Sequence, residues 1–479
     1  MALARRGGQL STSRRKRANP HRPALHAAFR SSTLRETVFL VGLVVAIFFV
    51  AWTYHFIQLC LDLNTEGGED HGDRKLPGLV SPERSKIESE ARQLRGSASV
   101  DNERQSIKRS KATKGGFERF VGIALDLSGL EPNETLHRLD TEDPFGTRNF
   151  DKKLMEEETR LGRILTMEEI EKLFPCPQIE ERITLPDFRI EAKAKAFRDG
   201  VKGTFLFFQH LRKAGGTNFC SLAEKNLPKR AQPRYYCMPD MAWSGNKNAG
   251  YLHSWSNEEI TRRMKEHRIA GNEWENFDPT RHFDLPAVFA TSFRHPLDRA
   301  LSQFRFECVE DRGCHEKDIH RWWEKRSDLK NIYTKTFADP AVGAKRYFRG
   351  SENSQQRRMF MSTAIGTLSK FHIVLSMEWL AYAAPQVKGT LGFKDVSALT
   401  TRVRPHIGQA KREDGQDTNA LGSASIKKAS WVPEEYLDEK QYTKMSEDLA
   451  LDEVLTDVAR RMFLERLVCT DLGGGVPTG

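Results

Sequence analysis

The longest uninterrupted apolar run lies near the amino terminus. Residues 37–61 contain no Asp, Glu, Lys or Arg, and a helix of that length can cross a bilayer core of roughly 30 Å. Trp52 and Tyr54 lie toward its carboxyl end, as interfacial anchors do. The pattern predicts an uncleaved transmembrane signal anchor. A cleaved signal peptide and a buried core helix are the alternatives, and the absence of a small-x-small site disfavours cleavage.

A polar segment follows the anchor. Residues 62–116 contain no Phe, Tyr or Trp, and charges of both signs alternate with Gly and Ser. Such a composition buries too little apolar surface to offset the entropy lost on ordering. We therefore expect a largely disordered stem over residues 62–165, a helix within 151–173, and a globular domain over 166–472.

Two strand–loop–helix patterns stand out in the globular part. The apolar run 203–211 leads through residues 212–218 into a helical stretch that ends near Leu227, and the run 287–293 leads through 294–298 into another helix. Continuous apolar strands followed by helices are typical of a parallel sheet that is covered on both faces. The predicted fold class is α/β, with a P-loop-like parallel sheet flanked by helices.

Three further segments complete this picture. Residues 371–376 have the character of a third strand, and 411–430 form a polar stretch that is typical of a surface loop. Apolar residues recur at helical spacing between Leu449 and Leu467, which predicts a helix near the carboxyl terminus.

The positive charge is concentrated before the apolar run. Of the net charge of +10, residues 1–36 carry +8, from nine Lys or Arg and one Glu, so the other 443 residues carry only +2. A nucleic-acid footprint spread over the folded part is thereby excluded, and no nucleic-acid partner is expected. The same asymmetry favours a basic cytoplasmic tail over 1–36 and a lumenal or extracellular location for everything after residue 61.

The cysteines agree with an oxidising compartment. The chain has seven, of which Cys60 belongs to the membrane edge. The other six can pair, and most of the connectivity stays open, with Cys308–Cys314 as the expected short bridge. There is no CxxC and no HxxxH spacing, so no metal site is expected. A sequon at Asn133 agrees with the lumenal location, and its glycosylation is left open.

The loop after the first strand has the chemistry of an oxyanion site. Gly215 and Gly216 let the backbone approach a ligand closely at the start of a helix, while Lys213 adds a positive charge and Thr217 a hydroxyl. The order differs from a Walker A loop, because Lys213 precedes both glycines, and this disfavours a standard nucleoside triphosphatase. A Gly-Gly turn beside a solvated lysine is the alternative interpretation.

The second unit adds another candidate anion ligand. Arg294 ends a strand, Pro296 lies near the start of the next helix, and Ser302 follows eight residues after Arg294. A guanidinium and a hydroxyl so placed can reach one phosphate. An ordinary surface arginine at a helix entrance is the alternative.

These segments together resemble a known family. Residues 208–219 (FQHLRKAGGTNF) are similar to the 5′-phosphosulfate loop of membrane-bound Golgi carbohydrate sulfotransferases, closest to the heparan sulfate 6-O- and 2-O-sulfotransferase branch. Residues 294–302 resemble the 3′-phosphate motif, 251–255 the segment that supplies the catalytic histidine, and 353–359 a later Asn/Gln/Arg-rich helix. The resemblance covers roughly residues 200–380. Ala214 and Asn218 depart from it, because the family commonly has Thr or Ser at both positions.

The resemblance implies transfer of a sulfuryl group from 3′-phosphoadenosine-5′-phosphosulfate (PAPS) to a glycan hydroxyl, by a single-pass type II protein of the Golgi membrane. His253 is the implied catalytic base, with His210 as the runner-up, and Lys213 has a catalytic as well as a binding role. The implied nucleotide-binding residues are Lys213, Ala214, Gly215, Gly216, Thr217, Asn218, Arg294 and Ser302.

Several features stay open at this point. A non-catalytic glycan- or nucleotide-binding relative and, less favoured, a P-loop-type kinase are the rival functions. A basic acceptor groove is expected, with four candidate residues: Lys345, Arg346, Arg357 and Arg358. The sequence leaves open the acceptor sugar, the ring position, the linkage and the oligomeric state.

Overall fold

The computed structural model describes residues 115–232, 237–238, 252–273, 275–309, 314, 316, 318–340, 352–401 and 433–472. All of them belong to one of the two units into which the chain divides, residues 94–479. The expected tail, the anchor at 37–61 and the polar loop at 411–430 lie outside the described residues. Among the helices that are described, none combines the length and the apolar character that a membrane span requires.

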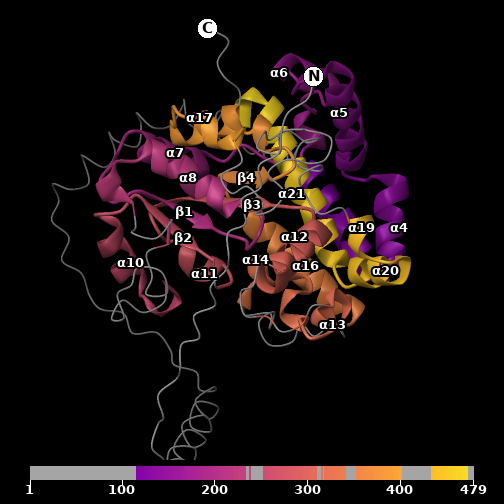
Figure 1. Ribbon diagram of the computed structural model, residues 1–479. Helices are drawn as coiled ribbons and strands as arrows, with labels where there is room; N and C mark the ends of the chain where they lie inside the picture. Colours follow the sequence, from indigo (N-terminus) through magenta and orange to yellow (C-terminus); the bar gives the residue numbers. More distant parts are fainter. Residues whose placement is uncertain are drawn as a thin grey trace, which may run out of the picture. The chain divides into compact units, whose positions relative to one another are not determined.

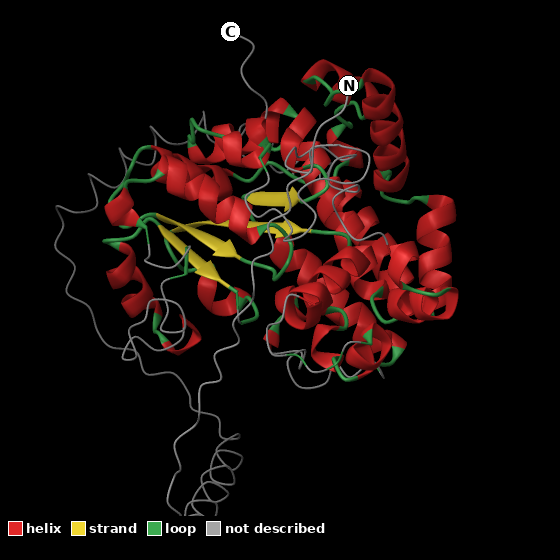
Figure 2. Ribbon diagram, in the orientation of Figure 1, coloured by secondary structure: helices red, strands yellow, loops and turns green. Residues whose placement is uncertain are grey.

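A four-stranded parallel sheet forms the centre of the domain, in the order β2–β1–β3–β4. Every residue of the four strands is buried, which explains the largely apolar sequences of β1, β3 and β4. Helices flank the sheet on both sides (Figures 1 and 2). The predicted α/β class and the three predicted strands are confirmed. The strands are β1 Phe205–Gln209, β2 Ile269–Asn272, β3 Ala287–Phe293 and β4 Ile373–Ser376.

The two faces of the sheet carry separate apolar cores. Successive side chains of a strand point to opposite faces, so Phe205 and Phe207 of β1 lie in one core, and Leu206 and Phe208 lie in the other. The first core is covered by the helix over residues 115–129 and by α4 Pro132–Glu142, α10 Asn257–Met264, α14 Ile332–Phe337 and α16 Ser354–Leu368. The second is covered by α5 Thr147–Leu161, α6 Met167–Leu173, α7 Phe188–Arg198, α8 Gly216–Asn226 and α17 Ala384–Leu391.

The predicted carboxyl-terminal helix is α21 Ala450–Val468, and Arg461 is its one residue that is not buried. It contributes to both cores and lies beside β4. Because it is enclosed on all sides, its charged residues need partners inside the protein. A smaller third core joins α12 Pro296–Phe304 and α13 Ile319–Glu324 to α20 Glu439–Glu447.

The remaining described helices are short. They are α11 Pro279–His282, α19 Pro433–Tyr436, the single-turn 3₁₀ helices η1 Ile179–Glu181, η2 Lys229–Ala231, η3 Leu252–Ser254, η5 Ser327–Leu329, η7 Leu380–Tyr382, η8 Ser397–Leu399 and η9 Thr470–Leu472, and the π-helical turn η4 Arg305–Val309.

The expectation of a largely disordered stem up to residue 165 is wrong for residues 115–165. This part is helical, and Phe120, Phe145 and Phe150 are buried in the two cores. The physical reason is composition: the segment that lacks aromatic residues ends at 116, and the aromatic side chains after it supply apolar surface to bury. The globular body therefore begins well before residue 166.

The helix that was expected within 151–173 is two helices. Gly162 ends α5 in a left-handed conformation, with a φ of 69°. Thr166 then begins α6 with a capping box, in which its side chain accepts from the Glu169 N–H and the Glu169 side chain bonds back to the Thr166 backbone. These are ordinary stop and start signals of helices.

Three cysteine pairs lie at disulfide distance. The expected Cys308–Cys314 bridge is confirmed, with Cα atoms 4.6 Å apart. The other two pairs, which the sequence left open, are Cys176–Cys469 and Cys220–Cys237, with Cα separations of 5.1 and 5.5 Å.

Candidate functional site

The two predicted anion-binding turns meet at the carboxyl ends of adjacent strands. β1 pairs directly with β3, so the loop after Gln209 and the turn after Phe293 leave the same edge of the sheet. A hydrogen bond joins the first loop to the end of β3, because the Ser292 hydroxyl donates to the Ala214 carbonyl at 2.5 Å. Open parallel sheets commonly bind ligands at this edge.

The backbone of the first loop takes a left-handed course. Lys213 has a φ of 65° and Gly215 a φ of 90°. The left-handed region costs a non-glycine residue about 1–2 kcal/mol, and such strain often occurs at functional sites. α8 begins at Gly216, so the amide N–H groups of the first turn point toward the space in front of this loop.

Close neighbours explain both glycines. A Cβ atom on Gly215 would lie 2.6 Å from the Met377 sulfur, and one on Gly216 would lie 1.7 Å from His210 Nε2. Neither position has room for a side chain unless its neighbour moves. The glycine pair is therefore dictated by packing as well as by backbone conformation.

Lys213 lies against an aromatic ring that sequence reasoning missed. Its Nζ is 4.2 Å from the centroid of the Phe306 ring, in the π-helical turn η4. A cation–π contact of this kind contributes about 0.5–2 kcal/mol. No spacing rule connects positions so far apart in the chain, so the sequence offers no signal for the pair. The Cys308–Cys314 bridge begins in the same turn.

Two of the predicted nucleotide-binding residues have hydrogen-bond partners within the protein. The Ala214 N–H donates to the Leu211 carbonyl at 3.2 Å, and its own carbonyl accepts from Ser292. Asn218 is buried, and its Nδ2 donates to the carbonyls of Ala398 and Thr401 at 3.0 Å each. That Ala214 and Asn218 bind the nucleotide stays a prediction. Thr217 lies half-buried on the first turn of α8.

The second turn is held through its backbone. The Tyr333 hydroxyl donates to the Arg294 carbonyl at 2.9 Å and accepts from the Arg294 N–H at 3.3 Å. The His295 N–H donates to Glu378 Oε1 at 2.8 Å. The half-buried Arg294 side chain precedes α12, on which Ser302 lies partly exposed. Pro296 occupies the first turn of α12, as predicted.

A buried ion pair fixes this second turn to the core. Glu378, just past the end of β4, accepts from the Ser376 hydroxyl at 2.8 Å and pairs with Arg460 Nη2 of α21 at 3.1 Å. Burial by itself raises the pKa of the Glu378 carboxyl, but the Arg460 guanidinium and the His295 N–H outweigh it and hold the pKa at about 2. The turn therefore rests on a carboxylate that stays ionised at neutral pH.

A carboxylate stands at the end of the neighbouring strand β2. Glu273 Oε1 lies 3.7 Å from Arg212 Nε and 4.0 Å from His210 Nδ1. Burial raises the pKa of Glu273, while the positive charges of Arg212 and Lys213 oppose that rise. Sequence reasoning missed this residue because β2, with the sequence Ile-Ala-Gly-Asn, is too short and polar to be recognised as a strand.

The segment with the predicted base lies on the first core. The backbone of His253 forms η3, while Leu252 and Trp255 are buried in the core that also contains Phe207. The Arg263 guanidinium lies 4.1 Å from the Trp255 ring centroid. The His253 side chain lies outside the described part, so its distance from the two turns stays a prediction.

One expected acceptor-groove residue has a structural role. Arg357 donates to the carbonyls of Ser128, Gly129 and Leu130 at 3.0, 3.2 and 2.8 Å, where the helix over 115–129 ends. Arg358 packs against Gly129. Lys345 and Arg346 lie outside the described residues. The predicted helix over 353–359 is the start of α16, which Asn353 caps.

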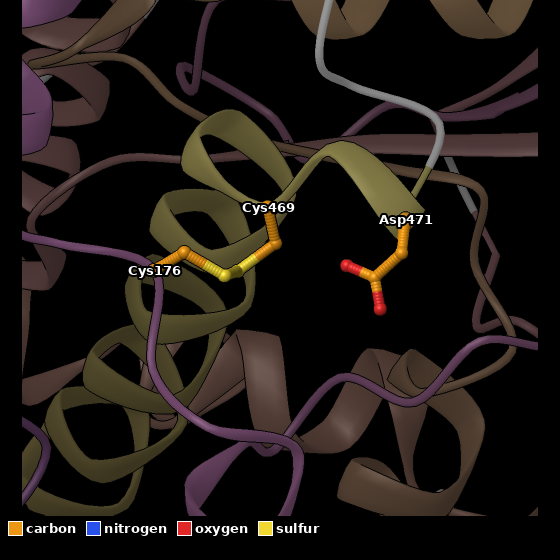
Figure 3. Close-up of side chains that lie close together, drawn as sticks. All are labelled: Cys176, Cys469 and Asp471. Atoms are coloured by element: carbon orange, nitrogen blue, oxygen red, sulfur yellow. A yellow bond between two sulfur atoms is a disulfide. The ribbon is translucent and has the colours of Figure 1, made fainter.

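Cys176, Cys469 and Asp471 form the group with metal-ligand spacing among the residues that the structure places (Figure 3). The two sulfur atoms are bonded to each other, and Arg182 Nη1 donates to both Asp471 oxygens at 2.7 and 2.8 Å. A disulfide lacks the thiolates that bind metals. This group is therefore a cross-link beside an ion pair.

Comparison of the chain with family models, with curated proteins and with solved structures finds no match. The case for a function therefore depends on the residues and the geometry described above.

Proposed function

We propose that this protein transfers a sulfuryl group from PAPS to a hydroxyl of a glycan, such as a heparan-sulfate-like polysaccharide. The observation that supports this most is the meeting of the two turns at one sheet edge, with Ser292 bonded to Ala214 between them. One turn offers helix N–H groups and Lys213, and the other offers Arg294 and Ser302. Two separate anion-binding sets suit a nucleotide with phosphates at both its 5′ and 3′ positions.

The roles follow from charge. Lys213 and the N–H groups of Gly215, Gly216 and Thr217 would hold the 5′-phosphate, which leaves when the sulfuryl group is transferred. Arg294 and Ser302 would hold the 3′-phosphate, which distinguishes this donor from ATP. As in phosphoryl transfer, catalysis then consists of in-line positioning and charge stabilisation.

The acceptor hydroxyl needs a base, and we assign this role to His253. General base catalysis contributes about 10²–10⁴-fold to a rate. His253→Ala should therefore lower turnover on that scale while 3′-phosphoadenosine-5′-phosphate binds nearly as before, because a base acts mainly in the transition state. Turnover and melting temperature should be measured together, with His210→Ala beside it. Near-normal turnover in His253→Ala would contradict the assignment.

The cellular setting belongs to the same proposal. A type II protein with residues 1–36 in the cytoplasm and residues 37–61 in the Golgi membrane would place the folded domain in the lumen, where glycan chains are modified. The three cysteine pairs agree with such an oxidising compartment.

Two rival functions lead to different results in one experiment. The full chain in detergent is first allowed to bind a labelled nucleotide in the presence of unlabelled competitors. It is then incubated with labelled PAPS and a panel of glycans. We expect 3′-phosphoadenosine-5′-phosphate to compete and ATP not to compete, with sulfate incorporated into one class of glycan. Equal competition by ATP would favour a kinase. Nucleotide binding without transfer to any glycan would favour a non-catalytic relative.

A further inference from the structure

His210, the first residue after β1, is held tightly in place. Its side chain is 12% exposed. Its ring stacks on Phe208 at 5.6 Å and 20°, and Phe208 stacks in turn on Phe219 of α8 at 4.1 Å and 15°. The stack fixes the plane of the imidazole, so its two nitrogen atoms have defined surroundings.

Those surroundings differ in charge. Nδ1 lies 4.0 Å from the Glu273 carboxylate at the end of β2. Nε2 occupies the space in which Gly216, the first residue of α8, would otherwise carry a Cβ. One side of the ring therefore faces an anion, and the other lies at the helix end where the proposed function places the 5′-phosphate.

From this arrangement, and resting on the proposed function, we infer that His210 is a catalytic residue that donates a hydrogen bond from Nε2 to the 5′-phosphate as it leaves. Glu273 is then a positioning residue, which orients the ring from its Nδ1 side. Gly216 is required because a side chain there would displace the ring.

The step balances without another reactant. The bond between sulfur and the bridging oxygen of the 5′-phosphate breaks, and its electron pair stays on that oxygen. A bond forms between sulfur and the acceptor oxygen, whose proton passes to His253. The His210 proton stays on Nε2 and is shared with the phosphate oxygen, adding to the charge stabilisation by Lys213.

The same geometry separates His210 from the role of base. In-line transfer places the attacking hydroxyl and the leaving oxygen on opposite sides of the sulfur. A histidine at the 5′-phosphate end is therefore at the wrong end to take the proton of the acceptor. This assignment gives the two candidate histidines different functions.

The test compares two ligands on the full chain in detergent by calorimetry: 3′-phosphoadenosine-5′-phosphate and adenosine 3′-phosphate, which lacks the 5′-phosphate. His210→Asn should weaken binding of the first by about tenfold or more, as expected for a hydrogen bond to a charged group. It should leave binding of the second unchanged, which also shows that the site is folded. Should this variant bind neither ligand, His210→Gln, which fills more of the ring's volume, is judged by the same criterion.

Glu273→Gln gives the second readout. It should weaken binding of 3′-phosphoadenosine-5′-phosphate in the wild-type background and have no effect in the His210→Asn background, because it acts through the imidazole. If Glu273 acted only as a negative charge near the phosphate, its removal would reduce repulsion, and Glu273→Gln would bind 3′-phosphoadenosine-5′-phosphate more tightly. Tighter binding by Glu273→Gln would therefore overturn its positioning role.

The matched controls are Glu266→Gln and His267→Asn, just before the amino end of β2 and away from the site. They should bind both ligands as the wild type does. If wild-type protein binds 3′-phosphoadenosine-5′-phosphate but His210→Asn binds it equally well, the role of His210 fails while the proposed function stands. If wild-type protein binds neither ligand, the proposed function fails, and the role of His210 fails with it.

Discussion

The β1–α8 loop and the β3–α12 turn occupy equivalent places in the fold, yet they are held in different ways. The first depends on backbone conformation and close packing, with left-handed residues at Lys213 and Gly215 and the His210 ring against Gly216. The second depends on hydrogen bonds made by its backbone. The Arg294 carbonyl accepts from the Tyr333 hydroxyl, and the His295 N–H donates to the buried carboxylate of Glu378.

This difference follows from what each turn would present to a ligand. The first would present main-chain N–H groups, so side chains must be kept away and glycine is required. The second would present the side chains of Arg294 and Ser302, so its backbone can be occupied by internal partners. A nucleotide site can thus combine one turn that is shaped by glycine with one that is anchored by buried charge.

The largest expected effect comes from removing the charge that anchors the second turn. Glu378→Gln removes the carboxylate that pairs with the buried Arg460 guanidinium, and breaking a buried pair typically costs about 3–5 kcal/mol. Denaturant unfolding should show this loss. Glu324→Gln, which removes an exposed partner of His320, should change the unfolding free energy by less than about 0.5 kcal/mol. A comparable small change in Glu378→Gln would contradict the anchoring role.

The same pair predicts a pH dependence. Because the pKa of Glu378 is held at about 2, below the value of about 4.3 for an unfolded chain, its stabilisation is complete above pH 4.3. It is lost as the pH falls toward 2. Unfolding free energies measured between pH 5 and 2 should decline more steeply in the wild type than in Glu378→Gln. Parallel curves would argue against an ionised Glu378 in the folded protein.

Nucleotide binding should divide between the two turns. Lys213→Ala and Arg294→Ala should each weaken binding of 3′-phosphoadenosine-5′-phosphate by about 1.5–3 kcal/mol. The affinity for adenosine 5′-phosphosulfate, which lacks the 3′-phosphate, should be nearly unchanged in Arg294→Ala. Lys195→Ala, at an exposed position of α7, is the control and should bind as the wild type does. Equal losses for both ligands in Arg294→Ala would refute the division.

Packing at the first turn can be tested with one methyl group. Gly216→Ala would place its Cβ 1.7 Å from His210 Nε2, so it should destabilise the protein by about 1–3 kcal/mol and weaken nucleotide binding. Gly366→Ala in α16 has nothing within 4 Å of the new Cβ, and it should stabilise the protein by about 0.5–1 kcal/mol. Thermal unfolding of the two variants should therefore shift in opposite directions. An unchanged or raised melting temperature in Gly216→Ala would show that the His210 ring moves aside at little cost.

The smallest effect is expected from one hydroxyl at the second turn. Tyr333→Phe removes the hydrogen bonds to the Arg294 backbone and should cost about 0.5–1.5 kcal/mol of unfolding free energy. Binding of 3′-phosphoadenosine-5′-phosphate should weaken slightly, while binding of adenosine 5′-phosphosulfate should not. Unchanged affinity for both ligands would mean that the hydroxyl stabilises the fold without positioning Arg294.

Local patterns were readable from the sequence, and distant partners were not. The apolar runs that became β1 and β3 and the glycine pair at 215–216 carry their signals within a few residues. No local sequence pattern marks Glu378 or Arg460, because the two residues meet only when β4 and α21 pack together.

The strand β2 escaped prediction for a different reason. It has only four residues and ends in a polar one, Asn272. The Asn272 side chain can be buried there because it bonds to the Gln209 side chain of β1 at 3.0 Å. Glu273, which depends on β2 for its place, was missed with it. The helix over 115–129 and α4 were missed because the polar character of the preceding segment was extended too far, past the first buried aromatic residue, Phe120.

The Cys176–Cys469 bridge, with a sequence separation of 293 residues, has a practical consequence. It makes most of the folded domain a covalent ring, so cutting any one peptide bond between the two cysteines opens the ring without releasing a fragment. Such a nicked protein runs as one band on a non-reducing gel and as two after the bridge is reduced. A single cut between these two cysteines is therefore visible only when a reductant is added.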